Sequence, residues 1–173
     1  MFSKKVFAYF LIFTMLFVVT GCGAKKSLKI TPEKFYVQYN ATLEEFSKSQ
    51  KINLNHMKIN KYDPIDGKEG FFYTPSGVKI GWGKDNAKDS DVRCLILKCS
   101  KLSQDAIYAM GIMVKAASEK TGTTKGLELL QKGKISMGVR DVKDAGVVFG
   151  LAVSEDVVLY SIADEEFHNK HLE

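Results

Sequence analysis

The chain has 173 residues, of which 45% are apolar, 26% are charged and only three are prolines. This length and composition exclude a disordered or fibrous chain and fit one globular domain with a core of its own. The formal net charge of +5 is too small to indicate a nucleic-acid-binding protein, and we expect no nucleic-acid partner.

The first 21 residues differ in character from the rest of the chain. Lys4 and Lys5 give a positive start, an uncharged apolar run extends from Val6 to Val19, and Thr20 and Gly21 are small. This order is typical of a secretory signal peptide. As a helix, the apolar run would measure about 21 Å, which is short of the roughly 30 Å hydrocarbon core of a bilayer. A permanent membrane-spanning anchor is therefore the weaker alternative.

Cys22 follows directly, in the order Val19-Thr20-Gly21-Cys22. An aliphatic residue, a small residue, Gly and then Cys resemble the lipobox of a bacterial lipoprotein. The resemblance implies that the signal peptide is cut before Cys22, and that the Cys22 thiol carries a diacylglycerol with acyl chains such as palmitate. Two or three acyl chains anchor a protein stably, whereas one gives only marginal binding. We expect an exported protein held through Cys22 at the cell membrane, or at the outer membrane of a two-membrane bacterium.

A helix is predicted from about 32 to 49, after a tether at 22–30. Thr31 is suited to cap the helix and Pro32 to occupy its first position. Apolar side chains then recur at helical spacing along one face, namely Phe35, Tyr39, Leu43 and Phe46. The polar stretch that follows contains a weak candidate strand at 52–59 and ends in turn signals.

The hydrophobic period changes to two from Phe71, which predicts a hairpin of 70–74 with 78–82. Val78, Ile80 and Trp82 share one face of it, so the favoured role of Trp82 is core packing, with contact to a ligand as the alternative. The glycines on either side of Trp82 would let a helix or loop lie close to the other face.

The run from 92 to 100 predicts a central strand covered on both sides, because three successive residues, 95–97, are apolar. It contains Cys94 and Cys99, whose Cα atoms would be about 16 Å apart in a strand, whereas a disulfide needs about 4.4–6.8 Å. We expect two reduced thiols, one of them buried. A metal site is the alternative, but the surrounding sequence holds no cluster of His or Cys.

The second half repeats the order of helix and then strands. Ser103 caps a predicted helix that ends at Gly122 and is apolar on most sides, so we expect it to be the most buried helix. A short helix before Gly133, a short strand near 135–139 and a hairpin of 146–153 with 157–163 follow. The repeat indicates an internal duplication only faintly, because few residues are identical between the halves.

These elements predict an α+β fold, in which an antiparallel sheet of four to six strands has two or three helices packed on one face. We assign residues 1–21 to a lipoprotein signal peptide, 22–30 to the tether, 31–165 to a single domain and 166–173 to a flexible tail.

No motif in the chain carries catalytic chemistry. The sequence lacks a G-x-S-x-G serine and a P-loop, and His56 lies in a polar stretch that we expect to be exposed. Glu165, His168 and His171 have helical spacing, but form at best a weak metal face. We predict no catalytic residue, no metal and no cofactor.

The expected function is that of a membrane-anchored envelope lipoprotein, acting as a non-catalytic binding or interaction module of unknown ligand. Its partners would be the membrane, through the lipid anchor, and a protein or small-molecule ligand. Two alternatives stay open: an envelope interaction protein of phage or mobile-element type, and an envelope hydrolase with an unrecognised site.

Overall fold

The computed structural model describes residues 28–131 and 135–171. The predicted signal peptide and Cys22 lie outside these residues. Within them, none of the helices has both the length and the apolar character needed to cross a bilayer. The elements are α2 (Pro32–Gln50), η1 (Asn55–Met57), β1 (Lys61–Pro64), β2 (Glu69–Tyr73), β3 (Lys79–Gly83), β4 (Cys94–Cys99), α3 (Gln104–Thr121), η2 (Lys125–Leu130), β5 (Gly138–Asp144), β6 (Val147–Val153), β7 (Val158–Asp164) and α4 (Glu165–His171).

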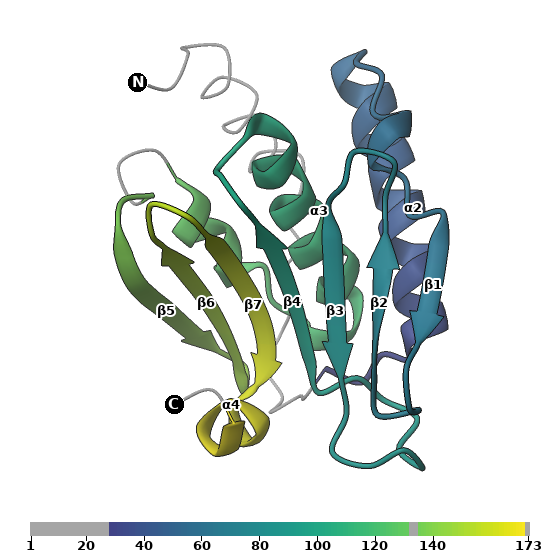
Figure 1. The fold of residues 1–173 in the computed structure, drawn as a ribbon, viewed down its shortest axis with the longest axis vertical. Helices are drawn as coiled ribbons and strands as arrows, with labels where there is room; N and C mark the ends of the chain where they lie inside the picture. Colours follow the sequence, from purple (N-terminus) through teal and green to yellow (C-terminus); the bar gives the residue numbers. More distant parts are fainter. Residues whose placement is uncertain (1–27, 132–134, 172–173) are drawn as a thin grey trace.

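The strands form one antiparallel sheet in the order β1-β2-β3-β4-β7-β6-β5 (Figure 1). The α+β class is confirmed, but the prediction of four to six strands is wrong, because the sheet has seven. The prediction missed β1 and shortened β5, which are the two edge strands of the sheet. β1 has only four residues, and β5 is exposed over most of its length. Edge strands need no apolar alternation, because one or both of their faces meet water.

The sheet is assembled from two similar halves. α2 precedes β2, β3 and β4, and α3 precedes β5, β6 and β7, with β1 added at one edge. The last strands of the two halves, β4 and β7, pair at the centre from Cys94↔Ala163 to Cys99↔Val158. The repeat of helix and strands predicted from the sequence therefore corresponds to a repeat in topology about the β4–β7 pair (Figure 1).

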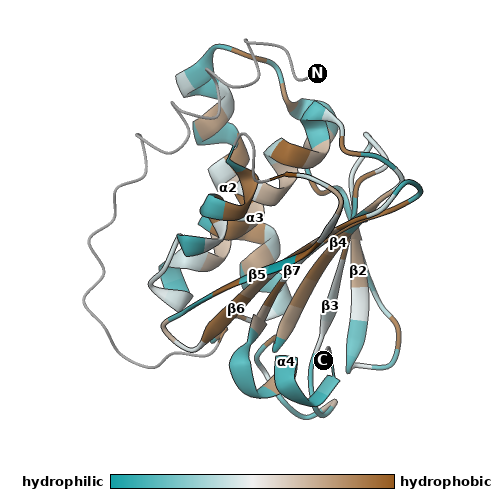
Figure 2. Cartoon of the chain, turned by 90° about the vertical axis from the view of Figure 1, so that its left-hand side faces the viewer, coloured by the Kyte–Doolittle hydropathy of each residue, from teal (hydrophilic) through white to brown (hydrophobic). Residues whose placement is uncertain are grey.

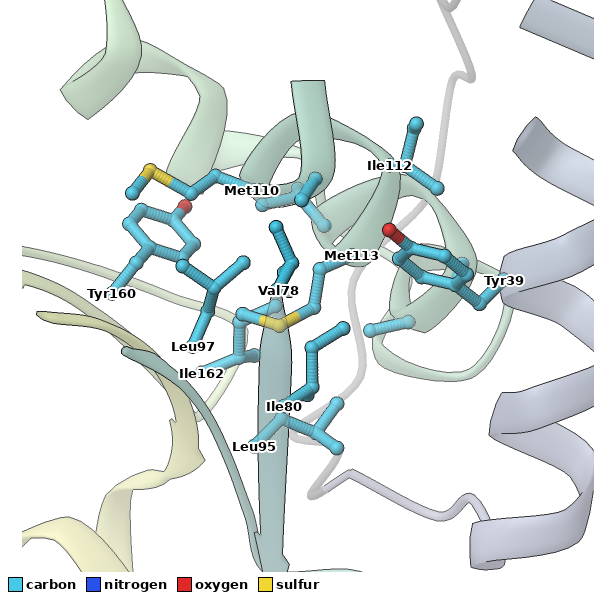
Figure 3. Close-up of a cluster of buried hydrophobic side chains, with 14 of the residues drawn as sticks. Tyr39, Val78, Ile80, Leu95, Leu97, Met110, Ile112, Met113, Tyr160 and Ile162 are labelled. Carbon is cyan, nitrogen blue, oxygen red and sulfur yellow. The ribbon is translucent and has the colours of Figure 1, made fainter. Parts of the chain in front are cut away.

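The core lies between the sheet and the pair formed by α2 and α3, which lie together on one side of it (Figure 2). Met110 of α3 lies over the sheet residue Tyr160, and Met113 points toward Leu97 and Ile162 (Figure 3). α3 buries 13 of its 18 residues and α2 buries seven of 19, which confirms α3 as the more buried helix. Burying one large apolar side chain contributes about 1.5–3 kcal/mol, so this layer dominates the stability of the domain.

α4 is not part of that layer. It lies at the end of the sheet below β7 (Figure 1), against the face that α2 and α3 leave uncovered. On that face Cys94, Val148 and Ala163 are in register and are buried, and the Phe167 ring of α4 lies near Gly83. The prediction that the helices pack on one face of the sheet is therefore wrong, because α4 packs against the other face.

Both ends of the described chain carry more structure than their sequences indicate. Leu28 and Ile30 are fully buried, and Ile30 forms a β-bridge with Val92, although these residues fall in the predicted tether. The apolar side chains at 28 and 30 alternate as in a strand, which explains why they enter the core. Residues 166–171, assigned to the flexible tail, belong to α4.

Candidate functional site

The uncovered face of the sheet contains a hollow of about 510 Å³, which is the strongest candidate for a binding site. Small-molecule sites have volumes of about 300–1,000 Å³. The hollow lies over β2, β3, β4 and β7, and α4 closes one end of it. Its lining residues are Glu69, Gly70, Phe71, Lys79, Gly81, Trp82, Gly83, Cys94, Ile96, Lys98, Leu159, Phe167 and His171.

Two glycines of β3 form the floor of the hollow. A Cβ atom on Gly81 would lie 3.3 Å from the Phe71 ring, and one on Gly83 would lie 3.7 Å from the Phe167 ring. The absence of side chains at these positions therefore leaves free space between the two aromatic rings. A glycine within a strand marks a place where another group can approach the backbone closely. At Gly83 that group is the Phe167 ring, so this glycine lets α4 lie close to the sheet, as the sequence indicated.

The end of the hollow away from α4 is positively charged. Lys79 and Lys98 lie directly opposite each other on β3 and β4. Like charges at such a cross-strand position repel each other. The Lys79 Nζ atom lies 3.5 Å from the centroid of the Phe71 ring, which is a cation–π contact. Within the described ranges, no carboxylate lies within ion-pair distance of either ammonium group.

The other end is fixed by ionic contacts around Arg93, the residue before β4. Its guanidinium donates to Asp164 Oδ1 at 2.8 Å and to Glu166 at 3.1 Å, and lies 3.1 Å from Asp85. The hydrogen bond that Arg93 donates to Asp164 is the main cause that raises the pKa of Arg93 above its ordinary value, against the opposing effect of burial. Asp164 also accepts from the Phe167 backbone at 3.0 Å and so caps α4. These contacts hold α4 against the sheet.

Glu69 and His171 are the titratable side chains at the α4 end of the hollow. Glu69 begins β2 and is exposed. His171 packs on Phe167 with ring centroids 4.5 Å apart, and its Nε2 atom lies 3.6 Å from Asp85. The hollow is therefore asymmetric, because two lysines lie at one end while a glutamate and a histidine lie at the other.

Cys94 borders the hollow but is poorly suited to be a nucleophile. Burial, with a smaller effect from Asp164, raises the pKa of its thiol to about 12. The thiol is therefore protonated at neutral pH, whereas the thiolate is the reactive form. Cys99, half-buried, lies at the opposite end of β4, and both cysteines are free. The separation predicted from the strand is therefore observed.

Trp82 is on the core face of the sheet, with only 4% of its surface exposed. Its ring lies 6.0 Å from that of Tyr62 and occupies the space above Gly70, where a Cβ atom would come within 2.7 Å of it. Trp82 thus belongs to the core and only borders the hollow. Cys22, the predicted lipidation site, lies outside the described residues.

The histidines do not form a metal site with their neighbours. His56 is exposed, as predicted, and pairs with Asp105 at 3.1 Å. In α4, Glu165 pairs with Lys143 at 3.7 Å while His171 turns toward Asp85. Among the residues that the structure describes, no group of three or more His, Cys, Asp or Glu side chains is arranged to hold a metal ion.

Apart from the two glycines beside Trp82, the residues that give the hollow its character were not singled out from the sequence. Lys79, Gly81 and Gly83 alternate along β3, and this alternation places them together on the face opposite Trp82. However, the contribution of Ile96 and Lys98 depends on the β3–β4 register, and that of Phe167 depends on the position of α4. Neither is visible in the sequence alone.

The fold and the hollow together define a small α+β domain with a ligand-sized depression on the uncovered side of an antiparallel sheet. Comparison of the chain with protein-family models, with curated proteins and with solved structures finds no match.

Proposed function

We propose that this protein is a bacterial envelope lipoprotein, anchored to the membrane through Cys22, whose domain is a non-catalytic binding module. The observation that supports the binding role is the hollow of about 510 Å³ on the uncovered sheet face. The order of basic residues, apolar run and lipobox at residues 4–22 supports the anchor.

The position of Leu28, the first residue that the structure describes, bears on how the module would be presented. Leu28 is fully buried, so the link between the anchored Cys22 and the domain has six peptide steps. At about 3.6 Å for each step, this link spans at most about 22 Å. The domain would therefore be held close to the membrane surface.

A binding role fits the side chains of the hollow better than a hydrolytic one. The Cys94 thiol borders the hollow, and its raised pKa keeps it protonated. The apolar walls and the two lysines bind and orient a ligand without providing a base for the thiol.

The anchor is tested in the bacterial cell by labelling with radioactive palmitate. The wild-type chain is expected to carry the label and to sediment with membranes, and Cys22→Ala is expected to lose both properties. Cys99→Ala is the matched control and should behave as wild type. Membrane association of Cys22→Ala with processing still at residue 21 would overturn the lipoprotein proposal.

The binding face is tested in the anchored protein with a photo-crosslinking amino acid in place of Ile96, which lies in the hollow. The control position is Val37, which is 61% exposed on α2, away from the hollow. We expect an adduct at position 96 and none at position 37, and the mass of the adduct separates a small ligand from a protein partner. Equal labelling at the two positions, or none at position 96, would contradict a binding role for this face.

A further inference from the structure

We infer that the hollow binds an amphiphile with one negatively charged head group and an apolar body, an inference that rests on the proposed binding function. The walls of the hollow are apolar, and its positive charge is gathered at one end. This combination favours a ligand that has a negative charge at one end and is apolar along the rest of its length.

The apolar part of the ligand would lie between the two aromatic rings. Phe71 and Phe167 stand at opposite ends of the glycine floor, and Ile96 and Leu159 lie beside it on β4 and β7. All four side chains are half-buried in the described structure and keep apolar surface toward the hollow. A hydrocarbon chain or a ring that covers this surface gains about 25 cal/mol for each Å² that it removes from water.

The head group would lie between Lys79 and Lys98. The two lysines lie directly opposite each other on β3 and β4, where like charges are unfavourable, and the Lys79 ammonium rests on the Phe71 ring. In the described part of the chain neither lysine forms an ion pair with a carboxylate. A carboxylate, sulfate or phosphate between them would relieve the repulsion and accept charge-assisted hydrogen bonds from both. Lys61 lies farther along the same row but is paired with Asp63 at 3.5 Å, so it contributes less.

The α4 end of the hollow sets the direction of the ligand. Glu69 lines this end, and His171 lies beside Asp85, whose charge is shared with Arg93. A second negative group at this end would be repelled by the Glu69 carboxylate. The arrangement therefore favours a molecule with a single anionic head over one that is charged at both ends.

The inference is tested with the exported chain, residues 22–173, carrying Cys22→Ala, because this chain retains the whole described core. Laurate, below its micellar concentration, is titrated into the protein in a calorimeter, with dodecanol and dodecyltrimethylammonium as neutral and cationic matches. We expect saturable one-to-one binding of laurate that weakens with added salt, weaker binding of dodecanol, and none of the cation.

Two variants locate the site. The double variant Lys79→Gln and Lys98→Gln should weaken laurate binding by at least about tenfold, as loss of charged hydrogen bonds predicts. Lys34→Gln with Lys88→Gln removes the same charge from exposed positions and should leave the affinity unchanged. Gly83→Leu should abolish binding by filling the floor, with circular dichroism to verify that the sheet is intact.

The outcomes separate this inference from the function on which it rests. Equal affinity for laurate and dodecanol, or an equal loss in both lysine pairs, would overturn the anionic head group. Failure of laurate together with an adduct at position 96 would overturn the ligand class and leave the binding face in place. A dimer in sedimentation that Gly83→Leu dissociates would make a second copy of the chain the occupant and overturn the inference. Failure of both laurate and the adduct would overturn the binding function itself.

Discussion

Arg93 and Asp164 are joined through both their side chains and their main chains. The Arg93 guanidinium donates to Asp164 Oδ1 at 2.8 Å, and the Asp164 backbone N–H donates to the Arg93 carbonyl at 3.0 Å. Arg93 precedes β4, and Asp164 ends β7 and caps α4. One pair of residues therefore ties the centre of the sheet to the helix that closes the hollow.

Asp164→Asn is expected to lower the free energy of unfolding by about 2 kcal/mol, which is typical of losing hydrogen bonds between charged groups. Asp164 is only 2% exposed, so the Arg93 charge would be left without its buried partner. The measurement is urea denaturation. Glu166→Gln is the control, because Glu166 contacts the same guanidinium from an 84% exposed position and should cost less than about 1 kcal/mol. Equal losses in the two variants would show that burial of Asp164 does not matter.

Gly70→Ala is expected to displace the indole ring of the only tryptophan in the chain. The added Cβ atom would lie 2.7 Å from the Trp82 ring and 2.6 Å from the Asp63 carbonyl oxygen. Such overpacking costs about 1–3 kcal/mol, and the tryptophan emission should shift to longer wavelength as the ring meets water. Gly83→Ala is the control, because its Cβ atom would make an ordinary contact at 3.7 Å. An unchanged emission spectrum in Gly70→Ala would contradict the packing of Trp82 over Gly70.

The two thiols should react with maleimide at very different rates in residues 22–173 carrying Cys22→Ala. Cys99 is half-buried, whereas Cys94 is 2% exposed and lies beneath α4. We expect Cys99 to be labelled in the native protein and Cys94 only after unfolding. Mass spectrometry of digested samples measures this difference. Native labelling of Cys94 at the rate of Cys99 would show that α4 does not cover the sheet at this position.

The free energy of unfolding should fall as the pH rises through a range determined by the pKa of the Cys94 thiol. Burial raises the pKa of its thiol from the ordinary 9.0 to about 12 in the folded state. Between these values the unfolded chain loses the proton and the folded chain keeps it, so stability is unaffected below about pH 9 and falls from there to about pH 12. Tyr39 and Tyr160, whose pKa values burial also raises, add to the decline above pH 10.0.

The difference between the wild-type and Cys94→Ala curves isolates the contribution of this thiol. Cys94→Ala should be less sensitive to pH in this window, and Cys99→Ala should resemble wild type more closely, because Cys99 is less buried. Thermal denaturation at several pH values measures the slopes. Parallel curves for wild type and Cys94→Ala would contradict the burial of the thiol.

The sequence predicted well the segments whose structure is determined by their own residues. It predicted poorly the segments whose structure is determined by contacts with other parts of the chain. α2 and α3 begin at the predicted caps, Thr31 and Ser103, because a cap and an apolar face are local properties. β4 was predicted as a central strand from the successive apolar residues 95–97, and it lies at the centre of the sheet. The strand predicted near 135–139 begins earlier and is shorter than β5. The residues of β5 are mostly exposed, so they lack the alternation of apolar and polar side chains that identifies a strand.

The candidate site was much harder to predict than the fold. Lys79 and Lys98 are far apart in the sequence and meet only through the register of β3 with β4. Phe167 was assigned to a tail, since nothing in residues 165–171 shows that Asp164 and Arg93 hold this segment against the sheet. The hollow arises from tertiary contacts, and local patterns do not encode those.

The pairing of β4 with β7 also bears on when the domain can fold. This central ladder joins residues 94–99 to 158–163, so the two halves of the sheet cannot close until nearly the whole chain is available. Contacts between such distant segments form late and slow the folding of the chain. The sheet cannot form completely until the last strand has been synthesised. The polypeptide therefore lacks a closed tertiary structure for most of its synthesis. That is the state in which the signal peptide proposed above would require the chain to cross a membrane.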